Sequence, residues 1–140
     1  MSNLILQLPA LQIVIPLFAA PLCLLADRTG LAWIIALAAS SATTVTAVAL
    51  AYLTYHNGVI SYQMGGWAPP WGIEYVVDTA NAFILLLVSS IATIVLIYSP
   101  ASVAKEIRPG RGHLYYCMYV LCLTGLLGIA ITGDAFNVFV

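Results

Sequence analysis

The chain has 140 residues, of which 63% are hydrophobic and only 6% are charged. Soluble domains carry roughly 25% charged residues, so this composition excludes a water-soluble globular protein and predicts an integral membrane protein. The formal net charge is −1 with four basic residues, which excludes the basic surface that nucleic-acid binding requires.

The first predicted spanning helix covers residues 4–25. A transmembrane helix needs about 20 mostly apolar residues, and this run supplies them. Pro16 and Pro21 lie inside it. Membrane helices tolerate proline where neighbouring groups satisfy the freed carbonyls, so we expect a kinked helix packed in a bundle. A cleaved leader is not expected, because leaders start with a basic segment and nothing before Asp27 is charged.

The second predicted helix covers residues 31–55, after a tight ADRTG turn. Its centre is rich in small and hydroxyl side chains, which let helices approach closely in lipid, so we expect protein neighbours on more than one side. In the loop at residues 56–78, β-branched and aromatic segments flank GGWAPP. This pattern predicts a hairpin-like structure at the membrane surface.

Two more spanning helices are predicted in the second half of the chain. The third covers residues 79–98 and is expected to stop at the Ser-Pro pair that follows. Residues 99–112 form a charged connector, residues 113–132 form the fourth helix, and residues 134–140 have the pattern of a fifth helix start. The sequence thus predicts an all-α membrane protein with four transmembrane helices plus the start of a fifth.

The basic residues predict the orientation of these helices. All of them fall in the ADRTG turn or in the 99–112 connector: Arg28, Lys105, Arg108 and Arg111. Cytoplasmic loops carry an excess of Lys and Arg, so both segments are predicted to be cytoplasmic. The N-terminus and the 56–78 loop are then extracytoplasmic.

Three ionisable residues at predicted helix starts are candidate site residues. Asp78 directly precedes the third helix and Asp134 the predicted fifth. Each is expected to cap its helix, and the alternative is a role in an ion path at the outer mouth. His113 begins the fourth helix at the predicted cytoplasmic face, where it is either an interfacial residue or a proton-entry group.

The predicted helix centres contain no charged residue, only hydroxyls such as those of Thr43, Thr44 and Thr93. A proton or sodium path needs titratable groups near the midplane. The sequence also lacks metal-ligand spacing, a nucleophilic triad and paired catalytic carboxylates. We therefore predict no catalytic residue, cofactor site or metal site in this chain.

The stretch GGWAPPWGIEYVVDT, followed by NAFILLLVSSIATIVLIYSP and ASVAKEI, resembles the D subunit of Mrp-type multisubunit cation/proton antiporters. GLLGIAITGDAFNVFV at the end of the chain is also similar to that family. The D subunit is in turn similar to the antiporter-like membrane subunits of respiratory complex I. The residues that recur in this wider family correspond here to Asp78, Gly133, Asp134 and Asn137.

The resemblance implies an N-terminal segment of a longer protein, because the family's key glutamate and lysines lie beyond Val140. It implies a bacterial inner-membrane antiporter that exchanges protons for sodium or another monovalent cation, with other antiporter-complex membrane subunits as partners. The segment is expected to be inactive alone, as a transporter part rather than an enzyme. One alternative is a proton-translocating subunit of NADH:quinone oxidoreductase or a related complex. A second alternative is a structural membrane subunit without an ion path.

Overall fold

The structure is a computed structural model that describes residues 2–63, 66–67, 72 and 74–132. The predicted fifth helix start, with Asp134, lies outside the described residues.

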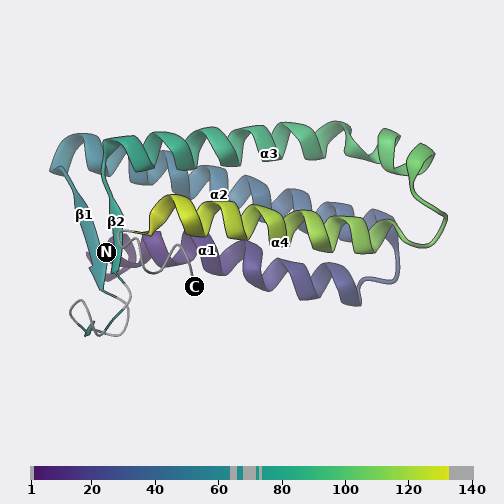
Figure 1. The fold of residues 1–140 in the computed structure, drawn as a ribbon, viewed down its shortest axis with the longest axis horizontal. Helices are drawn as coiled ribbons and strands as arrows, with labels where there is room; N and C mark the ends of the chain where they lie inside the picture. Colours follow the sequence, from purple (N-terminus) through teal and green to yellow (C-terminus); the bar gives the residue numbers. More distant parts are fainter. Residues whose placement is uncertain (1, 64–65, 68–71, 73, 133–140) are drawn as a thin grey trace.

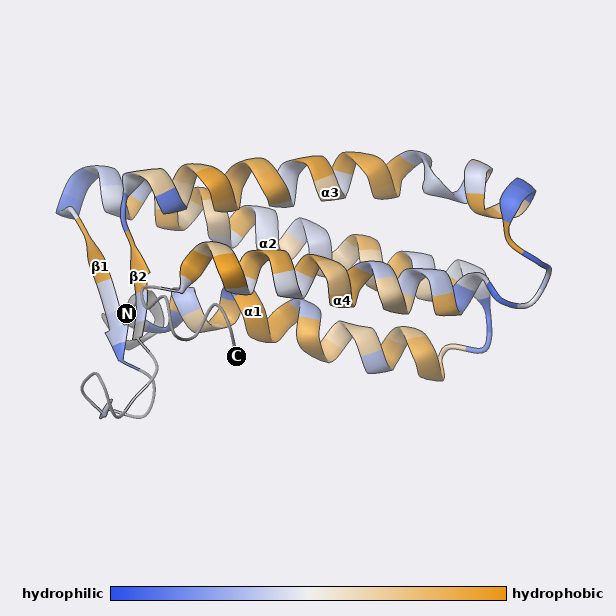
Figure 2. Ribbon diagram, in the orientation of Figure 1, coloured by the Kyte–Doolittle hydropathy of each residue, from blue (hydrophilic) through white to orange (hydrophobic). Residues whose placement is uncertain are grey.

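Four described helices are long and apolar enough to cross a membrane, and they form an up-and-down bundle (Figure 1). They are α1 (Ser2–Leu25), α2 (Thr29–Asn57), α3 (Thr79–Glu106) and α4 (Gly112–Ile131). Hydrophobic residues predominate along the length of the helices, and hydrophilic residues gather at the ends of the bundle (Figure 2). Large apolar side chains such as Phe18, Val45 and Ile94 are exposed on its outer surface, as expected for contact with lipid. The all-α membrane fold predicted from the sequence is confirmed.

The predicted end of the third helix is wrong, because α3 continues through Pro100 to Glu106. A proline inside a helix removes the backbone N–H that would bind the carbonyl four residues earlier, here that of Leu96. That carbonyl instead accepts hydrogen bonds from Trp33 Nε1 at 2.7 Å and Ser99 Oγ at 2.9 Å. Because these two donors satisfy the freed carbonyl, α3 can continue past Pro100.

Helix α2 packs against all three other helices, α1, α3 and α4. Its small residues account for this position, since Ala32, Ala36 and Ala47 are all fully buried. Small side chains let neighbouring backbones come close, and close packing is what holds helices together in lipid. The expectation of neighbours on more than one side of this helix is confirmed.

Two short strands cross one end of the bundle (Figure 1). Strand β1 (Ile60–Gln63) pairs in antiparallel register with β2 (Glu74–Val77). Val77 is fully buried against the core of the helices. On the same face of β2, Tyr75 packs against the edge of this core and stacks on Tyr62 of β1, with ring centroids 6.5 Å apart. Burial, and secondarily the nearby Tyr62, raises the pKa of Tyr75, so this ring stays uncharged near neutral pH.

Candidate functional site

A row of uncharged polar side chains runs through the interior of the bundle, and we call it the polar seam. It joins α1, α2 and α3 in the region where a membrane protein would otherwise be apolar. Its members are Gln12, Ser40, Thr43, Thr44, Thr46, Ser89 and Thr93.

The hydroxyls of the polar seam link α2 to α3 directly. Thr93 Oγ1 lies 2.8 Å from Ser40 Oγ and 3.0 Å from Thr44 Oγ1, and it also reaches the carbonyl of Ser89 at 2.9 Å. Thr43 and Thr44 both contact the carbonyl of Ser40. Hydrogen bonds between membrane helices are worth roughly 0.6 kcal/mol each on average, so this cluster holds the two helices in register.

Gln12 is the polar-seam residue that sequence reasoning missed. Its side chain is fully buried in α1, and its Oε1 accepts a hydrogen bond from Thr46 Oγ1 of α2. Gln12 Nε2 is buried with no hydrogen-bond partner among the described residues. The sequence does contain a signal for this contact, namely a glutamine in the middle of an apolar span. Burying an amide without a hydrogen-bond partner costs free energy, so such a residue is expected to pair with another polar group.

The chemistry that the polar seam can carry out is limited. Hydroxyls and amides donate and accept hydrogen bonds, but they do not ionise near neutral pH. Among the described residues, no group of three or more His, Cys, Asp or Glu side chains could hold a metal ion. The polar seam therefore organises the helices and presents polar atoms inside the bundle, without an acid or base of its own.

Asp78 lies at the start of α3, at the hairpin end of the bundle. Its Oδ1 accepts a hydrogen bond from the backbone N–H of Asn81 at 2.7 Å, which is the geometry of a helix N-cap. Asn81 Nδ2 donates to the carbonyl of Val76 at 2.9 Å, so the same turn also fixes the last residues of β2. The Asp78 carboxylate thus caps α3, and the Asn81 side chain links this first turn to the hairpin.

His113 lies at the opposite end of the bundle, in the first turn of α4. Its Nδ1 is buried and has no hydrogen-bond partner in the described part of the chain. Because α3 and α4 begin at opposite ends, the structure does not bring Asp78 and His113 together. The third candidate, Asp134, lies outside the described residues.

No family model matches the sequence. The chain is 33% identical over 137 residues to the N subunit of NADH-quinone oxidoreductase from Desulforudis audaxviator, which is 96% of this chain and 27% of that protein. It is 29% identical over 141 residues to the D subunit of the Na(+)/H(+) antiporter from Alkalihalophilus pseudofirmus, which is 100% of this chain and 27% of that protein. The chain thus spans about a quarter of the length of these relatives.

Two solved structures contain the same fold. A chain of the membrane-bound sulfane sulfur reductase, an archaeal respiratory membrane complex, matches 95% of this chain with a TM-score of 0.85 and 26% identity. A chain of the Mrp complex from Dietzia sp. DQ12-45-1b matches 97% of it with a TM-score of 0.81 and 27% identity. These matches cover 27% and 24% of the two larger chains. The chain is therefore a homologue of one segment of the antiporter-like membrane subunits of Mrp antiporters and NADH-quinone oxidoreductases.

Proposed function

We propose that this chain is a membrane segment of a cation/proton antiporter complex that exchanges protons for sodium or another monovalent cation. The supporting observation is that sequence and fold agree over nearly the whole chain with the D subunit of an Na(+)/H(+) antiporter and with a chain of an Mrp complex. Its partners in this proposal are the other membrane subunits of an antiporter complex, and its location is the bacterial inner membrane.

Within such a complex, we assign the segment a supporting role rather than that of the central proton relay. The polar seam holds α1, α2 and α3 together through neutral groups. A relay needs titratable groups deep in the membrane, and the described helix interiors carry none that is charged. Asp78 and Asp134 act mainly as helix caps, and His113 acts at the cytoplasmic interface. A direct part in the ion path is the alternative role for these three residues.

The second candidate function is proton translocation in a quinone oxidoreductase or related respiratory complex. It is favoured by the 33% identity to the oxidoreductase N subunit and by the TM-score of 0.85 to a chain of the sulfane sulfur reductase complex. In that case the chain is part of an oxidoreductase assembly. A purely structural role is the third candidate.

Two matched chimaeras test these alternatives. In the antiporter chimaera, this chain replaces the matching segment of the Alkalihalophilus pseudofirmus protein, and sodium-dependent collapse of a pH gradient is measured in everted vesicles of an antiporter-deficient bacterium. In the oxidoreductase chimaera, it replaces the matching segment of the Desulforudis audaxviator protein, and proton pumping coupled to quinone reduction is measured.

Transport by the antiporter chimaera alone is the expected result. Transport by the oxidoreductase chimaera alone would favour the respiratory alternative. Assembly of both chimaeras without transport by either would contradict the antiporter proposal and favour a structural role. Immunoblots of the purified complexes establish that each chimaera has assembled.

A further inference from the structure

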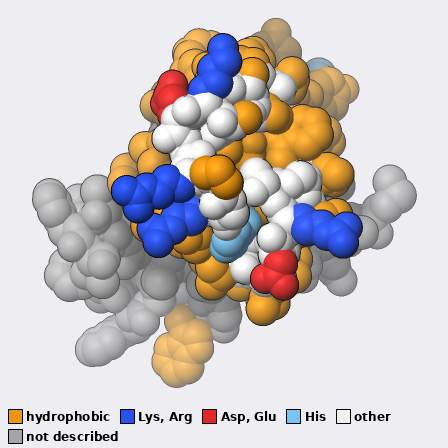
Figure 3. Space-filling view, turned by 90° about the vertical axis from the view of Figure 1, so that its right-hand side faces the viewer, with side chains coloured by type: hydrophobic (Ala, Val, Ile, Leu, Met, Phe, Trp, Pro, Cys, Tyr) orange, Lys and Arg blue, Asp and Glu red, His pale blue; other side chains and the backbone are white. Residues whose placement is uncertain are grey.

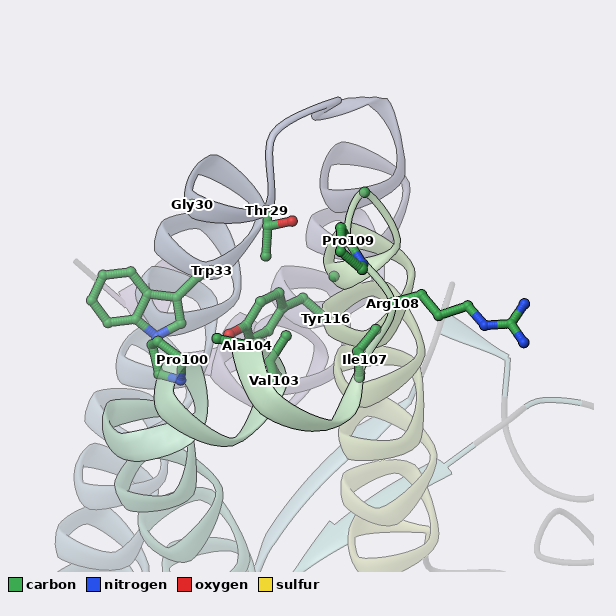
Figure 4. A pocket seen from close by; sticks show the side chains of 12 residues that line it. Thr29, Gly30, Trp33, Pro100, Val103, Ala104, Ile107, Arg108, Pro109 and Tyr116 are labelled. Carbon is green, nitrogen blue, oxygen red and sulfur yellow. The ribbon is translucent and has the colours of Figure 1, made fainter.

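A groove with a volume of about 330 Å³ lies at the end of the bundle opposite the hairpin. The start of α2, the end of α3, the α3–α4 connector and the start of α4 form its walls (Figure 4). Its volume is at the lower end of the range of roughly 300–1,000 Å³ that small-molecule sites occupy. Most of its lining is apolar, and the side chains of Trp33, Val103 and Ile107 contribute to it.

The fold itself creates this groove. Trp33 is held in the wall because its indole N–H donates to the carbonyl of Leu96. The part of α3 beyond Pro100 supplies the opposite wall. Gly112 allows α4 to begin directly against Thr29, since a Cβ at position 112 would collide with the Thr29 side chain. The groove is therefore built into the packing of the helices, and the α3–α4 connector completes it with Arg108 and its neighbours.

The end of the bundle that contains the groove is positively charged. Lys and Arg side chains surround this end (Figure 3). The segments that meet here carry four basic residues, Arg28, Lys105, Arg108 and Arg111, against two acidic ones, Asp27 and Glu106, which leaves a net charge of +2. Arg108 lies at the mouth of the groove, with its guanidinium directed away from the apolar lining (Figure 4).

The two helix starts at the groove add to this positive potential. Helices α2 and α4 begin after Arg28 and Arg111, and neither helix has a side-chain cap hydrogen bond. An uncapped N-terminus exposes free backbone N–H groups and the positive end of the helix dipole. Thr29 and Gly112, the first residues of these two helices, are in contact, so the two positive ends reinforce each other.

We propose that this groove binds an anionic phospholipid of the surrounding leaflet. The glycerol region and the upper acyl chain lie against the apolar lining beside Trp33, and the phosphate lies at the mouth near Arg108 and the two helix starts. A bilayer lipid has this combination of charge and apolar surface, and basic pockets between transmembrane helices are suited to lipid headgroups. Trp33 lies about one turn inside α2, at the depth where indole rings collect in membranes.

Quenching of Trp33 fluorescence by brominated lipids tests the proposal. The full chain with Trp67→Phe and Trp71→Phe retains Trp33 as its single tryptophan among the original three. It is reconstituted into vesicles of phosphatidylcholine with increasing fractions of brominated phosphatidylglycerol, or of brominated phosphatidylcholine as the neutral control. We expect the anionic lipid to bind beside Trp33 roughly fivefold more tightly than the neutral one, the preference that one well-placed basic residue gives.

Two pairs of variants distinguish the groove from general surface charge. Arg108→Gln should abolish most of the preference, whereas Lys105→Gln, which removes an equal charge outside the groove lining, should retain it. Ala104→Phe should fill the groove and reduce quenching by phosphatidylglycerol. Ala101→Phe is the control, because Ala101 is an exposed residue of α3 outside the lining, and this variant should leave the quenching by phosphatidylglycerol unchanged.

Three results would overturn the proposal. Equal quenching by the two lipids would show that the groove does not select an anion or is covered by another helix. An equal loss of the preference for phosphatidylglycerol in Arg108→Gln and Lys105→Gln would mean that general surface charge, and not the groove, causes this preference. Unchanged selectivity in Ala104→Phe, with helix content verified by circular dichroism, would locate the lipid outside the groove.

Discussion

Trp33 Nε1 donates a 2.7 Å hydrogen bond to the carbonyl of Leu96, the same carbonyl that Pro100 leaves without its helical partner. The bond joins α2 to α3 at the point where α3 would otherwise be interrupted. Buried carbonyls without a partner are costly in a membrane, so the tryptophan and the proline are energetically coupled. This coupling lets α3 extend to Glu106 and form a wall of the groove.

The first prediction is that Trp33→Phe destabilises the bundle less when position 100 is alanine. In the native background, the variant loses an interhelical hydrogen bond worth about 0.6 kcal/mol on average, in addition to some packing. With Pro100→Ala, a backbone N–H can again bind the Leu96 carbonyl, so loss of the indole donor should matter less. The free energies of unfolding of the native chain, the two single variants and the double variant in mixed sodium dodecyl sulfate micelles give the coupling energy.

The double-mutant cycle cancels the packing change, because the smaller ring is common to both backgrounds. A coupling energy of zero would mean that the Ser99 hydroxyl, 2.9 Å from the same carbonyl, already satisfies it fully. The tryptophan would then contribute only its apolar ring.

The same region shows what could be predicted from the sequence and what could not. Four apolar runs of spanning length are visible in the composition alone, and so are the turn residues around the hairpin. The continuation of α3 past Pro100 was not predicted, because one of the two donors to the freed Leu96 carbonyl is Trp33, which lies 63 positions away in another helix. Local rules for proline describe the cost of a freed carbonyl but not which residue offsets it.

The candidate site was predictable to a similar extent. Asp78 directly precedes an apolar run, so its capping position follows from local sequence, and the cap bond to Asn81 is 2.7 Å long. The pairing of Gln12 with Thr46 could not be predicted, because it depends on how α1 and α2 are rotated against each other. Hydrophobic periodicity determines this rotation in water, but it is a weak signal when every face of a helix is apolar.

The second prediction concerns two glycines of α4 with different surroundings. Gly112→Ala should destabilise the bundle by about 1–3 kcal/mol, since the new methyl group would overlap the Thr29 side chain. Gly125→Ala should be neutral or slightly stabilising, because apart from the neighbouring backbone of α4 no described atom lies within 4 Å of the position that a Cβ would take. Unfolding in mixed micelles measures both variants.

A third variant provides a check on the cause. Thr29→Ala in the Gly112→Ala background removes Cγ2 and Oγ1, the two atoms nearest to the new methyl group, and leaves only Cβ close to it, so much of the lost stability should return. If it does not return, the cost arises from the backbone at the start of α4 and not from the contact with Thr29.

The third prediction tests Asp78 as a helix cap. Asn caps a helix about as well as Asp, so Asp78→Asn should have little effect, whereas Asp78→Ala should cost about 1 kcal/mol. Thermal unfolding in detergent, followed by circular dichroism, compares the two variants. In the antiporter chimaera, transport should follow the same order. Loss of transport in the Asn variant, with stability unchanged, would instead assign the carboxylate to the ion path.

The fourth prediction concerns orientation in the membrane. The basic residues are expected in the cytoplasm, so the new thiol in Lys105→Cys should be protected from an impermeant maleimide in intact cells, whereas that in Asn57→Cys should react. Both positions are exposed, and Cys122, the exposed native cysteine, is replaced by serine in the background. Permeabilised cells provide the control in which both positions react. The opposite pattern in intact cells would invert the proposed topology.

The fifth prediction is that the chain alone does not exchange cations for protons. Alternating access needs a titratable site that both sides of the membrane reach in turn, and the polar seam offers only neutral groups. His113 is confined to one end of the bundle, and Asp78 is used as a cap at the other. The purified chain is reconstituted in liposomes with a pH gradient, and sodium, potassium or lithium is added. The gradient should decay as it does in empty liposomes, whereas the antiporter chimaera in its complex should dissipate it. A cation-dependent collapse with the chain alone would contradict the supporting role and direct attention to Gln12, whose buried Nε2 has no partner among the described residues.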